Sequence, residues 1–68
     1  MKTIFQQFGK QLKKLRENKG WSQGELSRKS GIHRTYISGI EKGLRNPSLK
    51  NIDRLANALK VNIKHFFQ

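Results

Sequence analysis

The sequence predicts an all-α protein, a compact domain of five short helices, and three observations support this prediction. Apolar residues recur at three- and four-residue intervals along the chain, which is helical spacing. They never alternate with polar residues over a length typical of a strand. The chain has 68 residues, with six glycines and one proline that divide it into short units. This length allows a single domain, so residues 1–68 are expected to fold together.

The first helix is predicted by an apolar stripe with a charged, mostly basic face opposite it. The stripe consists of Phe5, Phe8, Leu12 and Leu15. The opposite face carries Lys10, Lys13, Lys14 and Glu17. Gly20 follows, and we expect it to cap the C-terminal end of this helix.

A second, shorter helix is expected between Ser22 and Gly31. Ser22 is a favoured N-cap residue, and Glu25 three positions later completes the pattern of a capping box. Leu26 is the apolar anchor of this helix, and Gly31 ends it after barely two turns.

A third helix is expected to begin near His33, to run to Lys42 and to end at Gly43. Its inner face consists of Tyr36, Ile37 and Ile40.

The C-terminal third of the chain predicts two further helices. Pro47 bars a helix from continuing through the turn at residues 45–48, and Ser48 can cap the next helix. The buried stripe of this fourth helix is Leu49, Ile52, Leu55, Ala56 and Leu59. Asn62 is expected to cap a short final helix that holds Ile63, Phe66 and Phe67.

The charge balance points to a polyanionic partner. Lys and Arg total 15 and Asp and Glu total 4, so the formal net charge is +11. Nucleic acid, an anionic membrane surface and an acidic protein all fit such a charge. A domain this small is not expected to enclose a substrate pocket, and no nucleophile–base pair or phosphate-binding loop occurs, so we expect no enzymatic activity.

Cofactors, metals and membrane insertion are also not expected. The chain has no cysteine and only two histidines, His33 and His65, which make a weak metal site at best. No apolar run approaches the ~20 residues of a membrane span, and the first eight residues are too few and too polar for a signal peptide. The absence of cysteine suits a reducing cytoplasm.

Two short helices joined across Gly31 match the requirements of a helix-turn-helix at about residues 22–42. Leu26 has to pack on Ile37 and Ile40, and the small Ser27 has to let the helices cross closely. Gly31 has to adopt a positive φ. The second helix of such a unit can enter the major groove of DNA.

Most of the chain, from Leu12 to Phe67, resembles the lambdoid-repressor-like helix-turn-helix family of the Cro or xenobiotic-response-element type. The elements that carry the resemblance are LR..KG.SQ.EL, SGI, YIS.IE.G.RNPS and L..LA.AL.V. The resemblance implies a lambda-repressor-like domain and a transcriptional regulator. Such a regulator binds a palindromic operator on double-stranded DNA as a homodimer, with its third helix in the major groove. The resemblance also implies a cytoplasmic protein encoded by a bacterium or a phage, with RNA polymerase as a further partner.

The segment HRTYISGIEKGLRN is similar in particular to controller proteins of bacterial restriction–modification systems. A phage repressor or an antitoxin would have a similar sequence. From a different class, a cationic membrane-surface peptide fits the charge and the first helix. The capped turns and three further helices argue against it, because surface activity needs none of them.

The resemblance assigns base contact to the N-terminal part of the third helix. The residues are Arg34, Thr35, Ser38 and His33, the last with phosphate contact as an alternative. Helical geometry also places Arg34, Thr35 and Ser38 away from the inner face. An arginine can bond guanine in a bidentate manner, and a threonine methyl fits thymine. A solvated helix face is the structural alternative.

Phosphate contact is predicted for residues on both sides of this helix. They are Gln23, Tyr36, Arg45, Asn46, Ser48, Lys50 and Asn51. Gln23 lies at a helix N-terminus, where amide donors and the helix dipole favour a phosphate. An ordinary polar first turn, a packing role for Tyr36 and a polar loop are the alternatives.

Two further assignments concern structure and assembly. By the resemblance, Arg16 pairs with Glu41 and fixes the third helix to the first. The dimer interface is predicted at Ile63, Phe66 and Phe67, because exposed apolar groups at a chain end favour an interface. Packing within the chain is the alternative.

Four positions depart from the family pattern. His33 replaces the usual Ser or Thr N-cap, so weaker capping is expected. Gly24 and Gly39 lie within helices, and Gly39 is expected to leave a base-facing position empty or to allow close approach of DNA. Lys60 replaces the usual glycine between the last two helices and is expected to strain that turn.

Overall fold

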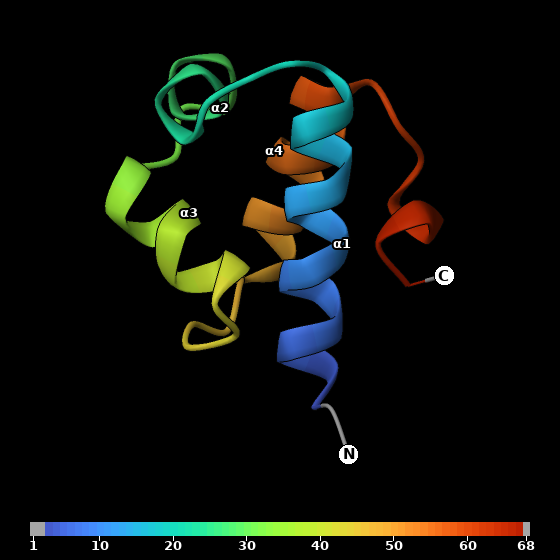
Figure 1. Cartoon of the computed structure of the whole chain (residues 1–68). Helices are drawn as coiled ribbons and strands as arrows, with labels where there is room; N and C mark the ends of the chain where they lie inside the picture. The colour runs from blue at the N-terminus through green and yellow to red at the C-terminus, as the bar shows by residue number, and fades with distance from the viewer. Residues whose placement is uncertain (1–2, 68) are drawn as a thin grey trace.

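In the part of the chain that the computed structural model describes, residues 3–67, every regular element is helical, which confirms the all-α class. The elements are α1 (Ile4–Asn18), α2 (Gln23–Ser30), α3 (Arg34–Glu41), α4 (Leu49–Leu59) and the 3-10 helix η1 (Ile63–Phe67). Helix α1 runs through the middle of the molecule, with α2 and α3 on one side and η1 on the other (Figure 1). The expected fifth α-helix is thus a 3-10 helix, a form common in short terminal pieces.

Side-chain caps begin the helices, although not all of them as predicted. Ser22 accepts a hydrogen bond from the Glu25 backbone N–H at 3.1 Å. The Glu25 carboxylate pairs with Arg28 instead of returning to Ser22, so only half of the predicted capping box forms. A full capping box instead joins Thr3 and Gln6 at the start of α1, where we did not predict one.

The turns between helices use left-handed backbone conformations. Gly31 has φ of 75°, as the helix-turn-helix geometry requires, and Gly20 has φ of 73° directly after the C-cap of α1. Lys60 has φ of 57°, and among the described residues it is the one non-glycine residue with positive φ. The expected strain after α4 is therefore present, because a side chain in this region crowds its own backbone.

The core contains residues from all five elements. Its largest fully buried side chains are Leu12, Leu26, Ile37, Ile40, Leu55, Leu59 and Phe66. The Phe66 ring lies 4.8 Å from the ring of Phe8, centroid to centroid, and so joins η1 to α1. Leu49, predicted as buried, is 78% exposed because it begins α4 at the edge of the domain.

Helices α1 and α3 touch through their backbones at Gly9. A Cβ atom at this position would lie 2.1 Å from the carbonyl oxygen of Ile40 and 2.9 Å from that of Glu41. Only glycine permits this approach without a shift of backbone. Gly9 therefore sets how closely the C-terminal end of α3 sits against α1.

Within residues 3–67 no helix is long and apolar enough to cross a membrane.

Candidate nucleic-acid interface

The N-terminal half of α3 presents a polar face to solvent. Arg34 and Thr35 are exposed and Ser38 is half-buried, while Ile37 and Ile40 are fully buried on the opposite side. The structure thus places the three predicted base-contacting residues of α3 on one accessible face. Base contact by these side chains stays a prediction.

His33 caps α3 through its imidazole ring. Its Nδ1 accepts a hydrogen bond from the Thr35 backbone N–H at 3.1 Å, so this histidine performs the capping that we expected to be weaker. In the neutral ring a nitrogen that accepts carries no hydrogen, so the hydrogen resides on Nε2. The ring is exposed, which leaves Nε2–H as a donor at the end of α3.

The predicted ion pair between Arg16 and Glu41 is confirmed. Arg16 Nε lies 2.7 Å from Glu41 Oε2, and Arg16 Nη2 lies 3.0 Å from Oε1. Arg16 Nη1 also donates to the Trp21 carbonyl at 2.7 Å. The two charged side chains are 9% and 4% exposed. The hydrogen bonds that Arg16 donates to Glu41, opposed by the desolvation of the guanidinium, raise the pKa of Arg16 above its ordinary value.

Gln23 joins this pair from the start of α2. Its Nε2 donates to Glu41 Oε1 at 3.0 Å, so α1, α2 and α3 meet at one carboxylate. The side chain is half-buried. An amide nitrogen has two hydrogens, which leaves one for another acceptor. Phosphate contact by Gln23 stays a prediction, and we missed its contact with Glu41.

Tyr36 holds the loop between α3 and α4. Its hydroxyl donates to the Asn46 carbonyl at 3.0 Å, and its ring is half-buried. A hydroxyl has a single hydrogen. The bond to the Asn46 carbonyl uses this hydrogen, so while that bond is formed the Tyr36 hydroxyl has none left to donate to a phosphate. The structure therefore shows a packing and positioning role for Tyr36, with which a phosphate contact is compatible, and that contact stays a prediction.

Arg45 lies across Gly39 on the flank of α3. A Cβ atom at Gly39 would lie 2.5 Å from Arg45 Cγ and 3.4 Å from its Nε. The expectation of an empty position at Gly39 is therefore wrong, because the arginine stem occupies it.

The remaining residues predicted to contact phosphate follow Arg45 toward α4. Asn46, Ser48 and Lys50 are exposed and Asn51 is half-buried. The Ser48 hydroxyl oxygen caps α4 by accepting from the Asn51 backbone N–H at 3.1 Å. Phosphate contact by these side chains and by Arg45 stays a prediction.

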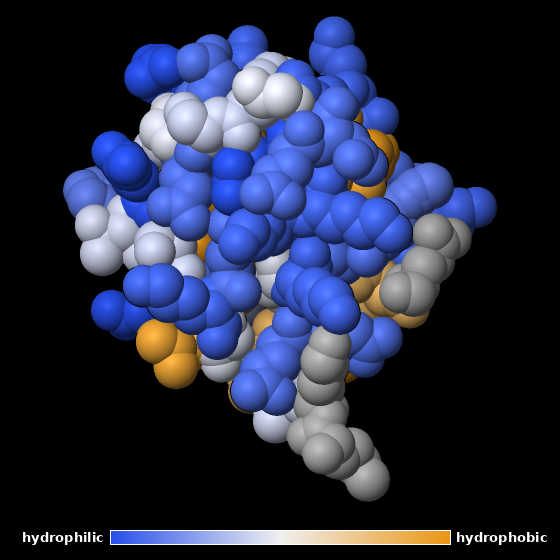
Figure 2. All heavy atoms as spheres, in the orientation of Figure 1, coloured by the Kyte–Doolittle hydropathy of each residue, from blue (hydrophilic) through white to orange (hydrophobic). Residues whose placement is uncertain are grey.

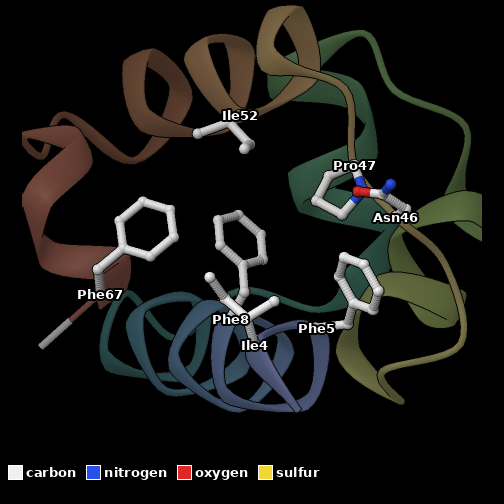
Figure 3. A pocket seen from close by; sticks show the side chains of 7 residues that line it. All are labelled: Ile4, Phe5, Phe8, Asn46, Pro47, Ile52 and Phe67. Carbon is white, nitrogen blue, oxygen red and sulfur yellow. The ribbon is translucent and has the colours of Figure 1, made fainter.

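The predicted dimer residues divide between core and surface. Phe66 is 0% exposed, so the structure assigns its ring to the core and not to an exposed interface. Ile63 is half-buried and Phe67 is 46% exposed. Phe67 lies at the rim of an apolar hollow of about 190 Å³ between α1, η1, α4 and the α3–α4 loop (Figure 3). The side chains that line it are Ile4, Phe5, Phe8, Asn46, Pro47, Ile52 and Phe67.

Few acidic groups offset the basic surface. Hydrophilic side chains cover most of the face seen in Figure 2. Of the four acidic residues, Glu41 is buried in its pair with Arg16 and Glu25 faces Arg28 and Lys29. Among residues 3–67 no group of three or more His, Asp or Glu side chains is placed to hold a metal ion.

Comparison with known proteins yields one family. The family model described as helix-turn-helix matches residues 12–66. A hypothetical transcription factor from Neisseria meningitidis is 51% identical over 47 residues, which are 69% of this chain and 44% of that protein. The chain therefore spans less than half the length of that relative.

Solved structures of similar length also match. The restriction–modification controller protein C.AhdI from Aeromonas hydrophila has a TM-score of 0.90 and 44% identity, over 93% of this chain and 96% of that one. A second controller protein, C.Esp1396I, was solved as a tetramer in complex with its natural 35-base-pair operator. It has a TM-score of 0.87 and 36% identity, over 98% of this chain and 88% of that one.

Proposed function

This chain belongs to the helix-turn-helix family, and from that premise we propose that it is a sequence-specific DNA-binding regulator of transcription. The observation that carries the proposal is the exposed polar face of α3, held in place by the buried Arg16–Glu41 pair on a domain of net charge +11. A helix presented in this way fits the major groove. The similarity to C.AhdI and C.Esp1396I supports a restriction–modification controller as the specific role.

Arg34, Thr35 and Ser38 read base edges in this proposal. Arginine bonds guanine O6 and N7, and threonine offers a hydroxyl and a methyl group. Gln23 on one flank of α3 and the residues of the α3–α4 loop on the other contact the two phosphate backbones. These contacts fix the register of the helix and carry no sequence information themselves.

The active species in this proposal is a homodimer. A symmetric dimer matches an inverted repeat whose half-sites lie about one helical turn apart. The exposed apolar side chains around Phe67 supply the surface for association, since patches of this kind mark interfaces. Phe67→Ser should shift the sedimentation equilibrium toward monomer, while Leu44→Ser, which changes an exposed apolar residue that does not line the hollow, should not.

Regulation follows from the position of the bound dimer. A dimer that covers a promoter excludes RNA polymerase, and a dimer bound upstream can contact and recruit it. The protein acts in the cytoplasm of a bacterial cell, where that DNA lies, and the proposal assigns it binding and no catalysis.

Selection of bound sites from random duplex DNA tests the proposal. Enrichment of an inverted repeat, and loss of that enrichment in Arg34→Ala, would support it. Failure to enrich any sequence, together with liposome binding that duplex DNA does not compete, would overturn it in favour of a membrane-surface role.

A further inference from the structure

An open hollow lies beside the exposed face of α3, on the side of α4. Its volume is about 360 Å³, roughly ten times the ~30 Å³ that one water occupies in the liquid. It therefore has room for a phosphate group with its oxygens. The hollow is lined by the α2–α3 turn, one flank of α3 and the first half of α4, with the residues Gly31, Ile32, His33, Tyr36, Asn51 and Arg54.

Three of these side chains, those of His33, Asn51 and Arg54, bring hydrogen-bond donors to the hollow that no acceptor in residues 3–67 uses. The His33 ring accepts at Nδ1 from Thr35, which fixes its hydrogen on Nε2. Arg54 is exposed and carries a guanidinium with five N–H donors. The Tyr36 hydroxyl contributes none, because its hydrogen is already donated to the Asn46 carbonyl.

The Arg54 guanidinium makes no ion pair with a carboxylate of residues 3–67. The three ion pairs within residues 3–67 involve Arg16, Arg28 and Lys29, and none involves Arg54. Its neighbour Asp53 accepts from Asn57 along α4, at 3.4 Å. The hollow is thus lined by a cation and a fixed donor, a combination that fits an anion.

The position of the hollow relates it to the face that meets DNA. At 3.6 residues per turn, helix α3 has one flank of its exposed face at Glu41 and the other flank at Tyr36. Between these two flanks of α3 lie Arg34, Ser38 and Thr35. Gln23 flanks the Glu41 side, and the hollow flanks the Tyr36 side. A groove that receives α3 therefore places one strand of the duplex along each flank.

We propose that this hollow binds one phosphate of the DNA backbone, with Arg54 as its cationic ligand and His33 Nε2–H as a second donor. The inference rests on the proposed DNA-binding function and adds to it Arg54, a residue in the middle of α4 and outside the helix-turn-helix. Arg54 and Gln23 then hold opposite strands, which centres α3 in the groove. The role is positioning, so it affects all sequences alike.

The test measures affinity for the selected site and for an unrelated duplex of equal length, each over a range of salt concentrations. Arg54→Ala should weaken binding to both duplexes by the same factor, roughly tenfold, and reduce the slope of log K against log salt by about one. Arg54→Lys should restore the slope.

Lys14→Ala, on the outer face of α1, is the matched control for loss of one positive charge. It should leave the affinity and the salt slope nearly unchanged. His33→Ser keeps an N-cap, so its thermal unfolding should stay close to that of the wild type, with a smaller uniform loss of affinity.

Neutral methylphosphonate groups placed one at a time along the selected site locate the phosphate. One position should weaken binding of the wild-type protein and have no further effect on Arg54→Ala. The inference is overturned if Arg54→Ala and Lys14→Ala behave alike, or if every methylphosphonate affects both proteins equally. Wild-type protein that binds neither duplex would overturn the proposed function itself, and the inference with it.

Discussion

Replacing Glu41 by glutamine tests whether one buried ion pair holds the recognition helix in place. The change leaves the shape of the side chain but removes the negative charge beside Arg16. An arginine remains charged throughout the accessible pH range even without a partner, so the substitution leaves a buried cation without its counter-ion. The site is nearly closed to water, with side-chain exposures of 9% for Arg16 and 4% for Glu41.

The expected cost is a large part of the total stability. Breaking one side of a buried pair costs about 3–5 kcal/mol, and the retained amide oxygen places Glu41→Gln near the lower end, about 3 kcal/mol. A domain of 68 residues has roughly 3–10 kcal/mol in all. The substitution should therefore lower Tm by about 12–24 °C.

Urea and thermal unfolding, followed by the fluorescence of Trp21, measure this cost. Glu25→Gln is the matched control, because Glu25 forms an exposed pair with Arg28 whose side chains are 37% and 70% exposed. Such a surface pair contributes about 0–1 kcal/mol.

A double variant gives a second test. Arg16→Met combined with Glu41→Leu should lose less free energy of unfolding than the sum of the losses in the two single variants. Equal losses in Glu41→Gln and Glu25→Gln, or additive effects in the double variant, would refute the reasoning.

Three further substitutions test separate parts of the structure. Gly9→Ala should destabilise the fold by at least about 2 kcal/mol, because the new Cβ meets the Ile40 carbonyl at 2.1 Å; an unchanged urea midpoint would contradict the close contact of α1 with α3. Lys60→Gly should stabilise it by about 0.5–1 kcal/mol, since the φ of 57° favours glycine; a lower Tm would show that this turn is not strained. Arg34→Ala should weaken binding to the selected site by about 1–3 kcal/mol more than binding to unrelated DNA, as titrations of both duplexes would show; equal losses would remove Arg34 from base readout.

The regular spacing of apolar residues was sufficient to predict the helices and most of the core. Leu26, Ile37 and Ile40 are fully buried, as the helix-turn-helix requires, and Gly31 has the positive φ that its turn needs. Periodicity could not show that Leu49 is exposed, because that depends on where α4 begins at the edge of the domain.

Contacts between distant segments were harder to predict than the helices. The role of Gly9 depends on the path of the α3 backbone, and the role of Gly39 depends on the stem of Arg45, which approaches it from the following loop. Phe66 was predicted at a dimer interface because exposed apolar groups at a chain end favour one. Its burial depends on η1 folding back against Phe8 in α1, which no local pattern indicates.

The geometry around α3 explains why so basic a chain keeps a buried glutamate. A helix of eight residues is too short to hold its own orientation, so its position has to come from its neighbours. Glu41 accepts from Arg16 and Gln23 at one end of α3, and Tyr36 donates to the Asn46 carbonyl on its flank. Because the positive charge of Arg16 balances the negative charge of Glu41, this carboxylate adds no net negative potential to the face that carries Arg34. The same carboxylate therefore positions α3 and leaves its exposed face uniformly attractive to a polyanion.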